Sequence, residues 1–191
     1  MVSGHVGVAF AARARGPSIP MGWLLAATVA PDLVDYAFVA TGTCNLSGLY
    51  SHSLPAIAVA GTCLGAVAAW RTRSARAGLV VAVLVVLHLA ADFVTGRKLL
   101  WAGGPTIGLA AYDYPALDFV VELPIVAGGW WILRRTAGAP QWAGSIAMLV
   151  VLLIAQVVTD FGGYRKPNAC VTHDADGGRR PLALALASGE R

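Results

Sequence analysis

Long apolar runs, separated by short polar connections, make up most of the chain. Five of them approach the ~20 residues that an α-helix needs to cross ~30 Å of hydrocarbon. These runs are about Ile19–Thr41, Leu54–Trp70, Ala77–Thr95, Leu117–Leu133 and Trp142–Asp160. The shorter segment Val2–Ala14 predicts one further helix, half-buried among the others. We therefore predict an all-α fold, a polytopic transmembrane bundle with five to six helices.

The pattern changes at Phe161, where the chain becomes polar and Gly-rich. Charges and glycines crowd together in the stretch Asp174–Arg180. This composition is typical of disordered segments, because it offers little apolar surface to bury. We therefore predict two parts: a transmembrane helical domain over residues 1–160 and a polar, disordered C-terminal tail over residues 161–191.

Composition agrees with a lipid environment. Hydrophobic residues make up 57% of the chain and charged residues 13%, whereas a soluble domain carries roughly a quarter charged residues. The net charge of +4 comes mainly from Arg residues that lie between the apolar runs. Such placement is typical of orientation signals and headgroup contacts. We therefore expect an integral membrane protein whose partners are membrane lipids, and no nucleic acid.

The three cysteines are Cys44, Cys63 and Cys170. They are far apart in the sequence, and none belongs to a metal-binding spacing such as Cys-x-x-Cys. We therefore expect no disulfide framework.

Basic residues in the connections predict the orientation of the bundle. If the helices alternate in direction, three basic groups share one side. These are Arg13 with Arg15, Arg71 with Arg73 and Arg76, and Arg134 with Arg135. Short loops rich in Arg and Lys favour the cytoplasmic side. The other side has only Arg97 and Lys98 between helices, so we predict that it faces outward.

The same alternation brings histidines and carboxylates together at the outward side. The residues are His5, Asp32, Asp35, His52, His88 and Asp92. Asp32 and Asp35 are three residues apart, and His88 and Asp92 four apart, so each pair shares a helix face. Ser53 is suited to cap the third helix, and a helix N-terminus keeps His52 neutral and able to bind a metal.

A divalent cation would explain this group of polar residues. An ionised Asp in an apolar helix costs at least ~2.5 kcal/mol on insertion scales. Mixed His and Asp ligands suit zinc, manganese or iron, and we expect zinc or manganese. The predicted ligands are His5, Asp32, His52, His88 and Asp92. The alternative for each residue alone is a structural role, such as an interhelical hydrogen bond for His88 or an interfacial position for His5.

Further polar residues surround the predicted site. Arg97 and Lys98 are suited to grip a phosphate-bearing headgroup, although ordinary contact with anionic lipid is an alternative. Asp118 and Glu122 are four residues apart and share a helix face. Asp35 and Glu122 are the candidates for a general base.

Several short motifs resemble one known family. They are Gly4-His5, Pro31-Asp32-Leu33-Val34-Asp35, Ser51-His52-Ser53-Leu54, His88-Leu89-Ala90-Ala91-Asp92 and Leu99-Leu100-Trp101. In their order and spacing, over roughly residues 1–135, the chain resembles the YdjM-like membrane-bound metal-dependent hydrolases. Two features depart from the family. There is no second His shortly before Ser51, and a Pro-Asp-x-Asp motif is stretched by one residue.

The resemblance implies a metal-dependent hydrolase in the bacterial cytoplasmic (inner) membrane. Its expected substrate is a phospholipid or lipid-linked phosphate, because such molecules already lie beside the predicted site. Two alternatives stay open. One is a transporter or ion-coupled permease, since buried His and Asp also mark ion pathways. The other is a scaffold in which the polar residues only hold helices together.

Overall fold

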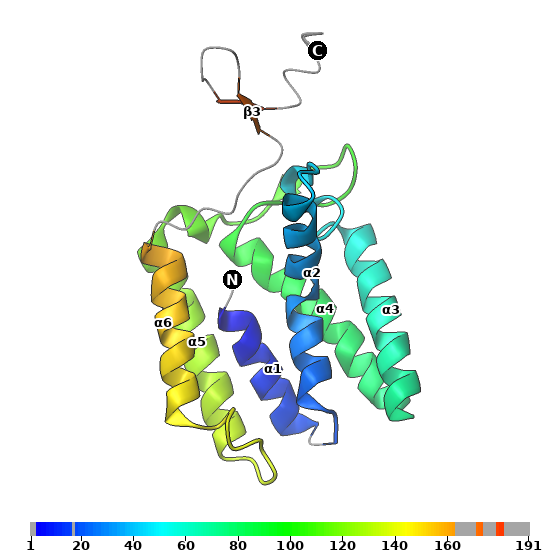
Figure 1. Ribbon diagram of the computed structural model, residues 1–191, viewed down its shortest axis with the longest axis vertical. Helices are drawn as coiled ribbons and strands as arrows, with labels where there is room; N and C mark the ends of the chain where they lie inside the picture. Colours follow the sequence, from blue (N-terminus) through cyan, green and yellow to red (C-terminus); the bar gives the residue numbers. More distant parts are fainter. Residues whose placement is uncertain (1–2, 17, 163–170, 174–178, 182–191) are drawn as a thin grey trace.

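The computed structural model describes residues 3–16, 18–162, 171–173 and 179–181. Within these residues the fold is all-α, as predicted, and has six α-helices (Figure 1). They are α1 (Ser3–Arg15), α2 (Met21–Ala40), α3 (Leu54–Thr72), α4 (Ala75–Thr95), α5 (Pro115–Arg134) and α6 (Ile146–Phe161). Two short strands, β3 (Val171–His173) and β4 (Arg179–Pro181), pair within the segment predicted to be disordered. The rest of that segment lies outside the described residues.

Four of the described helices, α2, α3, α4 and α5, are long and apolar enough to cross a membrane. This is what an integral membrane protein requires. The fifth predicted span is shorter than expected, because α6 has only 16 residues. Residues 140–145 form a turn, in which Ala143 and Gly144 donate to the carbonyl of Pro140. Ser145 then caps α6 by accepting a hydrogen bond from the Met148 N–H at 3.1 Å.

The connections gather at two ends of the bundle. At one end lie the turns α1–α2, α3–α4 and α5–α6, so the three basic groups share this end, as predicted (Figure 1). At the other end lie two longer connections. The first contains the 3₁₀ turn η1 (Leu46–Gly48). The second contains the hairpin of β1 (Lys98–Leu99) with β2 (Thr106–Ile107), followed by η2 (Ala111–Asp113).

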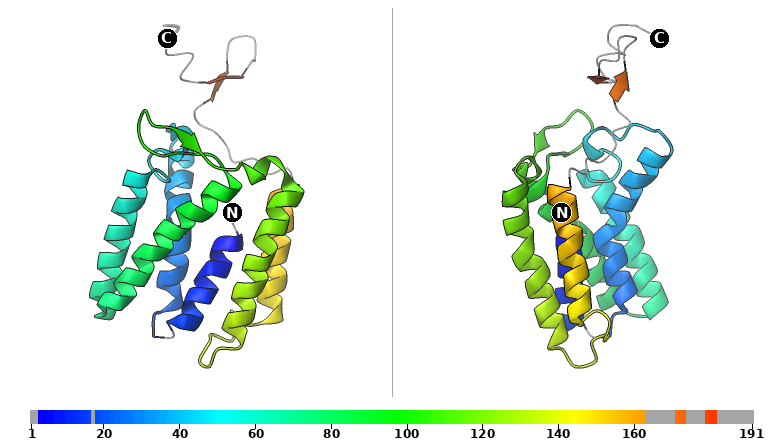
Figure 2. Two further views of the ribbon diagram at one scale, coloured as in Figure 1. Left: turned by 180° about the vertical axis from the view of Figure 1, so that it is seen from behind. Right: turned by 60° about the vertical axis from the view of Figure 1, so that its left-hand side comes forward.

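Helix α1 is short and lies inside the bundle, between α5 on one side and α2 and α4 on the other (Figure 2). Glycines allow this close approach. A Cβ atom at Gly7 would collide with the backbone of Ile125, and one at Gly129 would collide with the backbone of Gly7. Small residues let helix backbones approach each other closely in membranes. The first turn of α1, which carries His5, is therefore held at the centre of the protein.

The pattern of burial differs from that of a soluble protein on the outside of the bundle and around the candidate ligands. Large apolar side chains on the spanning helices are exposed, such as Val59 at 64% and Leu79 at 66%. Most of the ionisable candidates are buried instead, with His52 at 0%, His88 at 2% and Asp92 at 2% exposure. Ionisable side chains that face the bundle interior, with an apolar exterior around them, are the arrangement expected of helices in lipid.

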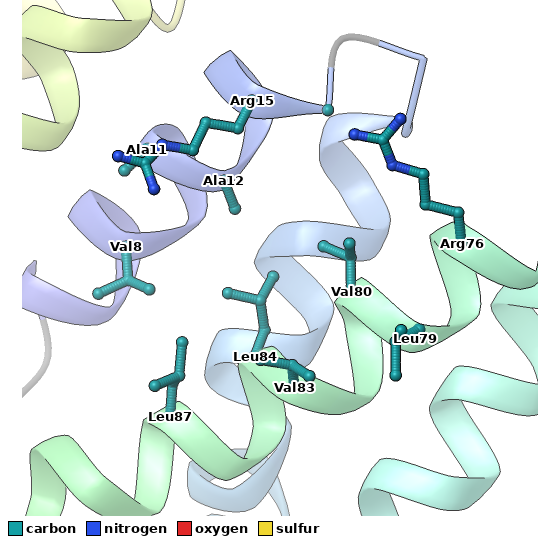
Figure 3. Close-up of a pocket in the computed structure, with 11 residues that line it drawn as sticks. Val8, Ala11, Ala12, Arg15, Arg76, Leu79, Val80, Val83, Leu84 and Leu87 are labelled. Atoms are coloured by element: carbon teal, nitrogen blue, oxygen red, sulfur yellow. The ribbon is translucent and has the colours of Figure 1, made fainter.

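A groove of about 540 Å³ runs between α1 and α4 (Figure 3). Its lining is apolar, with Val8, Leu84 and Leu87 among its side chains, except for Arg15 and Arg76. Both arginines belong to the basic end of the bundle. No carboxylate or histidine lines this groove, so none of the candidate metal ligands lies in it.

The expectation of no disulfide is wrong for one cysteine. Cys44, in the connection between α2 and α3, is disulfide-bonded. Cys63 is a free thiol and is exposed, while Cys170 lies outside the described residues.

Candidate metal centre

Four side chains from two helices and one loop meet in the half of the bundle opposite the basic turns. Asp32 comes from α2 and His52 from the loop that enters α3, while His88 and Asp92 lie one turn apart on α4. Each offers one ligand atom, and these atoms all lie within 4.8 Å of one another. Four of the five predicted ligands are therefore brought together.

Local sequence explains two of these positions. Pro31 lacks an N–H, so α2 loses the hydrogen bond to the Ala27 carbonyl immediately before Asp32. Ser53 caps α3 by accepting from the Ala56 N–H at 3.3 Å, which fixes His52 just ahead of the helix.

The distances between ligand atoms match the size of a metal site. The Nε2 of His52 lies 3.2 Å from the Nε2 of His88, 3.1 Å from an oxygen of Asp92 and 3.5 Å from an oxygen of Asp32. The Nε2 of His88 lies 3.7 Å and 4.0 Å from oxygens of Asp92 and Asp32. A tetrahedral zinc site has edges of about 3.3–3.6 Å, because its bonds are ~2.0–2.2 Å long. The distances from the two Nε2 atoms to the carboxylate oxygens and to each other are therefore comparable to the edges of such a site.

A backbone carbonyl sets the tautomer of His88. Its Nδ1 lies 2.7 Å from the carbonyl oxygen of Thr28, which can only accept, so Nδ1 carries a proton. In the neutral ring, Nε2 then presents its lone pair to the cluster. Two bare nitrogens 3.2 Å apart repel each other unless a proton or a cation lies between them. The pair His52–His88 therefore fits a shared cation.

A chain of hydrogen bonds supports the ring of His52. Its Nδ1 lies 2.7 Å from the hydroxyl of Ser51, which accepts from the Asn45 amide at 2.9 Å. The same amide donates to Asp35 at 2.7 Å. When Nδ1–H donates to Ser51, the Nε2 of His52 presents its lone pair to the cluster. Metal-binding histidines are usually oriented by such a hydrogen bond from the other ring nitrogen.

The carboxylates also change the proton affinity of His52. Burial alone would lower the pKa of its ring. The hydrogen bonds to Asp32 and Asp92 outweigh burial, and the pKa of His52 is raised above its usual value. The ring therefore lies in a field that favours positive charge, whether the charge is a proton or a metal ion.

His5 and Lys98 contact the cluster through Asp92. The Nε2 of His5 lies 3.2 Å from one oxygen of Asp92, and its ring stacks on His88 with centroids 3.8 Å apart. The ammonium of Lys98 lies 2.9 Å from the other oxygen. The β1–β2 hairpin holds Lys98 in this position, whereas its neighbour Arg97 is exposed.

Glu122 belongs to a different cluster. It lies with Asp118 and Asp160, whose oxygens are within 4.8 Å of one another. Its Oε2 accepts a hydrogen bond from the Gly4 N–H at 3.0 Å. Neither Glu122 nor Asp35 belongs to the group of four ligands, and Asp35 is linked to His52 through Asn45 and Ser51.

Sequence reasoning missed the supporting residues Thr28, Asn45 and Ser51, and the cluster partners Gln156 and Asp160. A carbonyl such as that of Thr28 leaves no signal in a sequence. Gln156 and Asp160 did leave one, because they are polar residues four apart in the last apolar run.

The donor set, two imidazole nitrogens and two carboxylates, is one that zinc and manganese accept. The buried Asp32, His52, His88 and Asp92 group can hold a divalent cation, whose charge would balance the two carboxylates. No protein-family model matches the chain, and neither a curated protein nor a solved structure matches it significantly. What the protein does has therefore to be inferred from these side chains.

Proposed function

We propose that the protein is a membrane-embedded metal-dependent hydrolase that cleaves a phospholipid or lipid-linked phosphate at the outer membrane interface. The observation that carries this proposal is the convergence of Asp32, His52, His88 and Asp92 within 4.8 Å, beside the ammonium of Lys98. A divalent cation held by these four residues would acidify a water molecule and polarise a phosphoryl oxygen.

Lys98 favours a phosphate ester as the substrate. Its ammonium lies 2.9 Å from an oxygen of Asp92, so it is within reach of any group that enters the site. Once a metal shares the charge of Asp92, the ammonium is available to neutralise a phosphate oxygen. Arg97 is next in the chain, exposed, and suited to hold a second phosphate oxygen at the interface.

The assignment of Asp35 changes with this arrangement. Asp35 accepts a hydrogen bond from Asn45, which also donates to Ser51, so we assign these three residues the role of positioning His52. Glu122 is linked to the four ligands through the first turn of α1, where Gly4 donates to Glu122 and the neighbouring His5 contacts Asp92. Its role as a general base stays a prediction.

Two features favour an outward-facing site in the cytoplasmic membrane of a bacterium. The basic turns lie at the opposite end, as expected for a cytoplasmic side. Cys44, at the same end as the cluster, is disulfide-bonded, and disulfides persist in oxidising compartments outside the cytoplasm. The resemblance to YdjM-like hydrolases supports the same proposal, because it rests on His5, Asp32, His52, His88 and Asp92.

Transport is less well supported. Transporters place their sites near the midplane of the membrane, between repeated halves. Here His52 lies in a loop, and Asp92 lies one turn before the end of α4. His52 and Asp92 are thus near one surface, where a lipid headgroup would meet them, while Asp32 and His88 lie deeper in α2 and α4.

The proposal is tested with detergent-solubilised protein loaded with Zn²⁺ or Mn²⁺ and offered a panel of phospholipids and lipid-linked phosphates. We expect release of a phosphate-containing product by the wild type and its loss in His88→Ala. Leu84→Ala is the matched control, since it removes a buried side chain one turn away on α4 without removing a ligand. Equal turnover by His88→Ala and the control would exclude a reaction at this site.

A further inference from the structure

A second polar cluster lies between α5, α6 and the first turn of α1. Asp118 and Glu122 are one turn apart on α5, and Gln156 and Asp160 are one turn apart on α6. Oxygens of the three carboxylates lie within 4.8 Å of one another. The cluster shares no residue with the first one.

Burial makes this concentration of acidic groups unfavourable on its own. Asp118 is 1% exposed and Glu122 0%. An ionised carboxylate inside an apolar span costs at least ~2.5 kcal/mol, and carboxylates this close also repel one another. Hydrogen bonds relieve part of this cost, since Gln156 donates to Asp160 at 2.6 Å and Gly4 donates to Glu122 at 3.0 Å.

Two buried side chains in the cluster retain unused acceptors. Within the described residues, neither oxygen of Asp118 accepts a hydrogen bond from an N–H or hydroxyl group. The same is true of the amide oxygen of Gln156, which is 0% exposed. Its amide nitrogen donates to Asp160, so the side chain of Gln156 belongs to this cluster. Buried acceptors nearly always have a partner, and a group that consists of acceptors is satisfied by protons or by a cation.

We propose that Asp118, Glu122, Asp160 and the amide oxygen of Gln156 form a second cation site, selective for a hard divalent ion such as Mn²⁺, Mg²⁺ or Ca²⁺. These ions prefer carboxylate and carbonyl oxygens, all of which this cluster offers. The first cluster has two imidazoles and suits a softer ion such as Zn²⁺. Asp160 lies in the last turn of α6, where the helix dipole also favours a positive charge.

The two sites differ in donor chemistry, so they can be filled separately. Full-length protein in detergent is stripped with a chelator, saturated with Zn²⁺ at the first site, and titrated with Mn²⁺ while free Mn²⁺ is followed by electron paramagnetic resonance. We expect one further Mn²⁺ to bind per chain. If the Zn²⁺-loaded wild type binds no Mn²⁺, the carboxylates hold protons instead, and the proposal is overturned.

Paired variants locate the bound Mn²⁺. Asp118→Asn with Asp160→Asn keeps the shape of the cluster and removes two charges, so it should lose the Mn²⁺ and keep the Zn²⁺. Asp92→Asn should do the reverse. Retained Zn²⁺ shows that the double variant is folded, and unchanged Mn²⁺ binding by that variant would overturn the proposal. Neither result depends on turnover, so a failure here is distinct from failure of the hydrolase proposal.

Discussion

At the scale of single residues, the two central histidines are held by different kinds of partner. A carbonyl fixes the proton on His88, because Thr28 oxygen can only accept. The hydroxyl of Ser51 contacts His52 and can either donate or accept. The direction of this hydrogen bond therefore depends on Asn45, which donates to both Ser51 and Asp35. The orientation of His52 is therefore the more sensitive to substitution of its surroundings.

Substitution of Ser51 tests this positioning role. Ser51→Ala removes the acceptor for the Nδ1–H of His52, and loss of such a partner typically weakens metal binding by about 10–100-fold. Zn²⁺ affinity measured by competition with a chelator should fall by this factor, and Ser51→Thr, which keeps the hydroxyl, should restore it. If Thr behaves like Ala, the hydroxyl has only a packing role.

The raised pKa of His52 predicts how metal binding depends on pH. A proton and a metal compete for Nε2, and the hydrogen bonds to Asp32 and Asp92 make the proton a stronger competitor than on an ordinary imidazole. Protonation is favoured below the raised pKa, so Zn²⁺ affinity should fall as the pH is lowered from about 8 to about 6, where histidine titrates. Calorimetric titrations in this range should show protons released on binding. An affinity independent of pH would contradict the assignment of His52 as a ligand.

At the scale of secondary-structure elements, the close contact of α1 with α5 positions the first turn of α1. This turn connects the two clusters, because the Gly4 N–H donates to Glu122 and the neighbouring His5 contacts Asp92. A helix as short as α1 does not cross the membrane and is held by packing instead. The contact between Gly7 and Gly129 therefore helps to hold His5 in place beside Asp92.

Adjacent glycines on α5 provide a matched test of this contact. Gly129→Ala places a methyl group against the backbone of Gly7 and should destabilise the protein by about 1–3 kcal/mol through overpacking. Gly128 has no atom within 4 Å of the added methyl. Gly128→Ala should therefore be neutral or stabilise α5 by up to about 1 kcal/mol, the usual helix preference for Ala. Thermal unfolding in detergent measures both, and equal effects would show that the contact of α1 with α5 is loose.

At the scale of the whole molecule, the basic turns and the long connections lie at opposite ends of the bundle (Figures 1 and 2). The first cluster lies in the half of the bundle with the long connections. This polarity predicts which residues an external reagent will reach.

Cysteine labelling in intact cells tests the sidedness. In a Cys63→Ser background, Trp101→Cys should react with a membrane-impermeant maleimide added outside, because it lies in the long connection after α4. Arg76→Cys, at the basic end, should react only after the cells are permeabilised. The opposite pattern would place the cluster in the cytoplasm and contradict an external substrate.

The amino-acid sequence alone determined the helices and their polarity. Apolar runs specify helices in lipid because a membrane requires internally satisfied backbone and apolar side chains, and both are local properties. The short range of helix geometry also made pairs such as His88 and Asp92 predictable, since residues four apart share a face.

Only the tertiary structure decided which polar residues meet. Glu122 and Asp92 both lie on spanning helices near the same end, yet the packing of α1 between α5 and α4 places them in separate clusters. Loop geometry placed Asp35 behind Asn45 rather than at the four ligands. Such contacts depend on how closely helices approach and how connections fold over them, and neither is encoded in the spacing of residues along one helix.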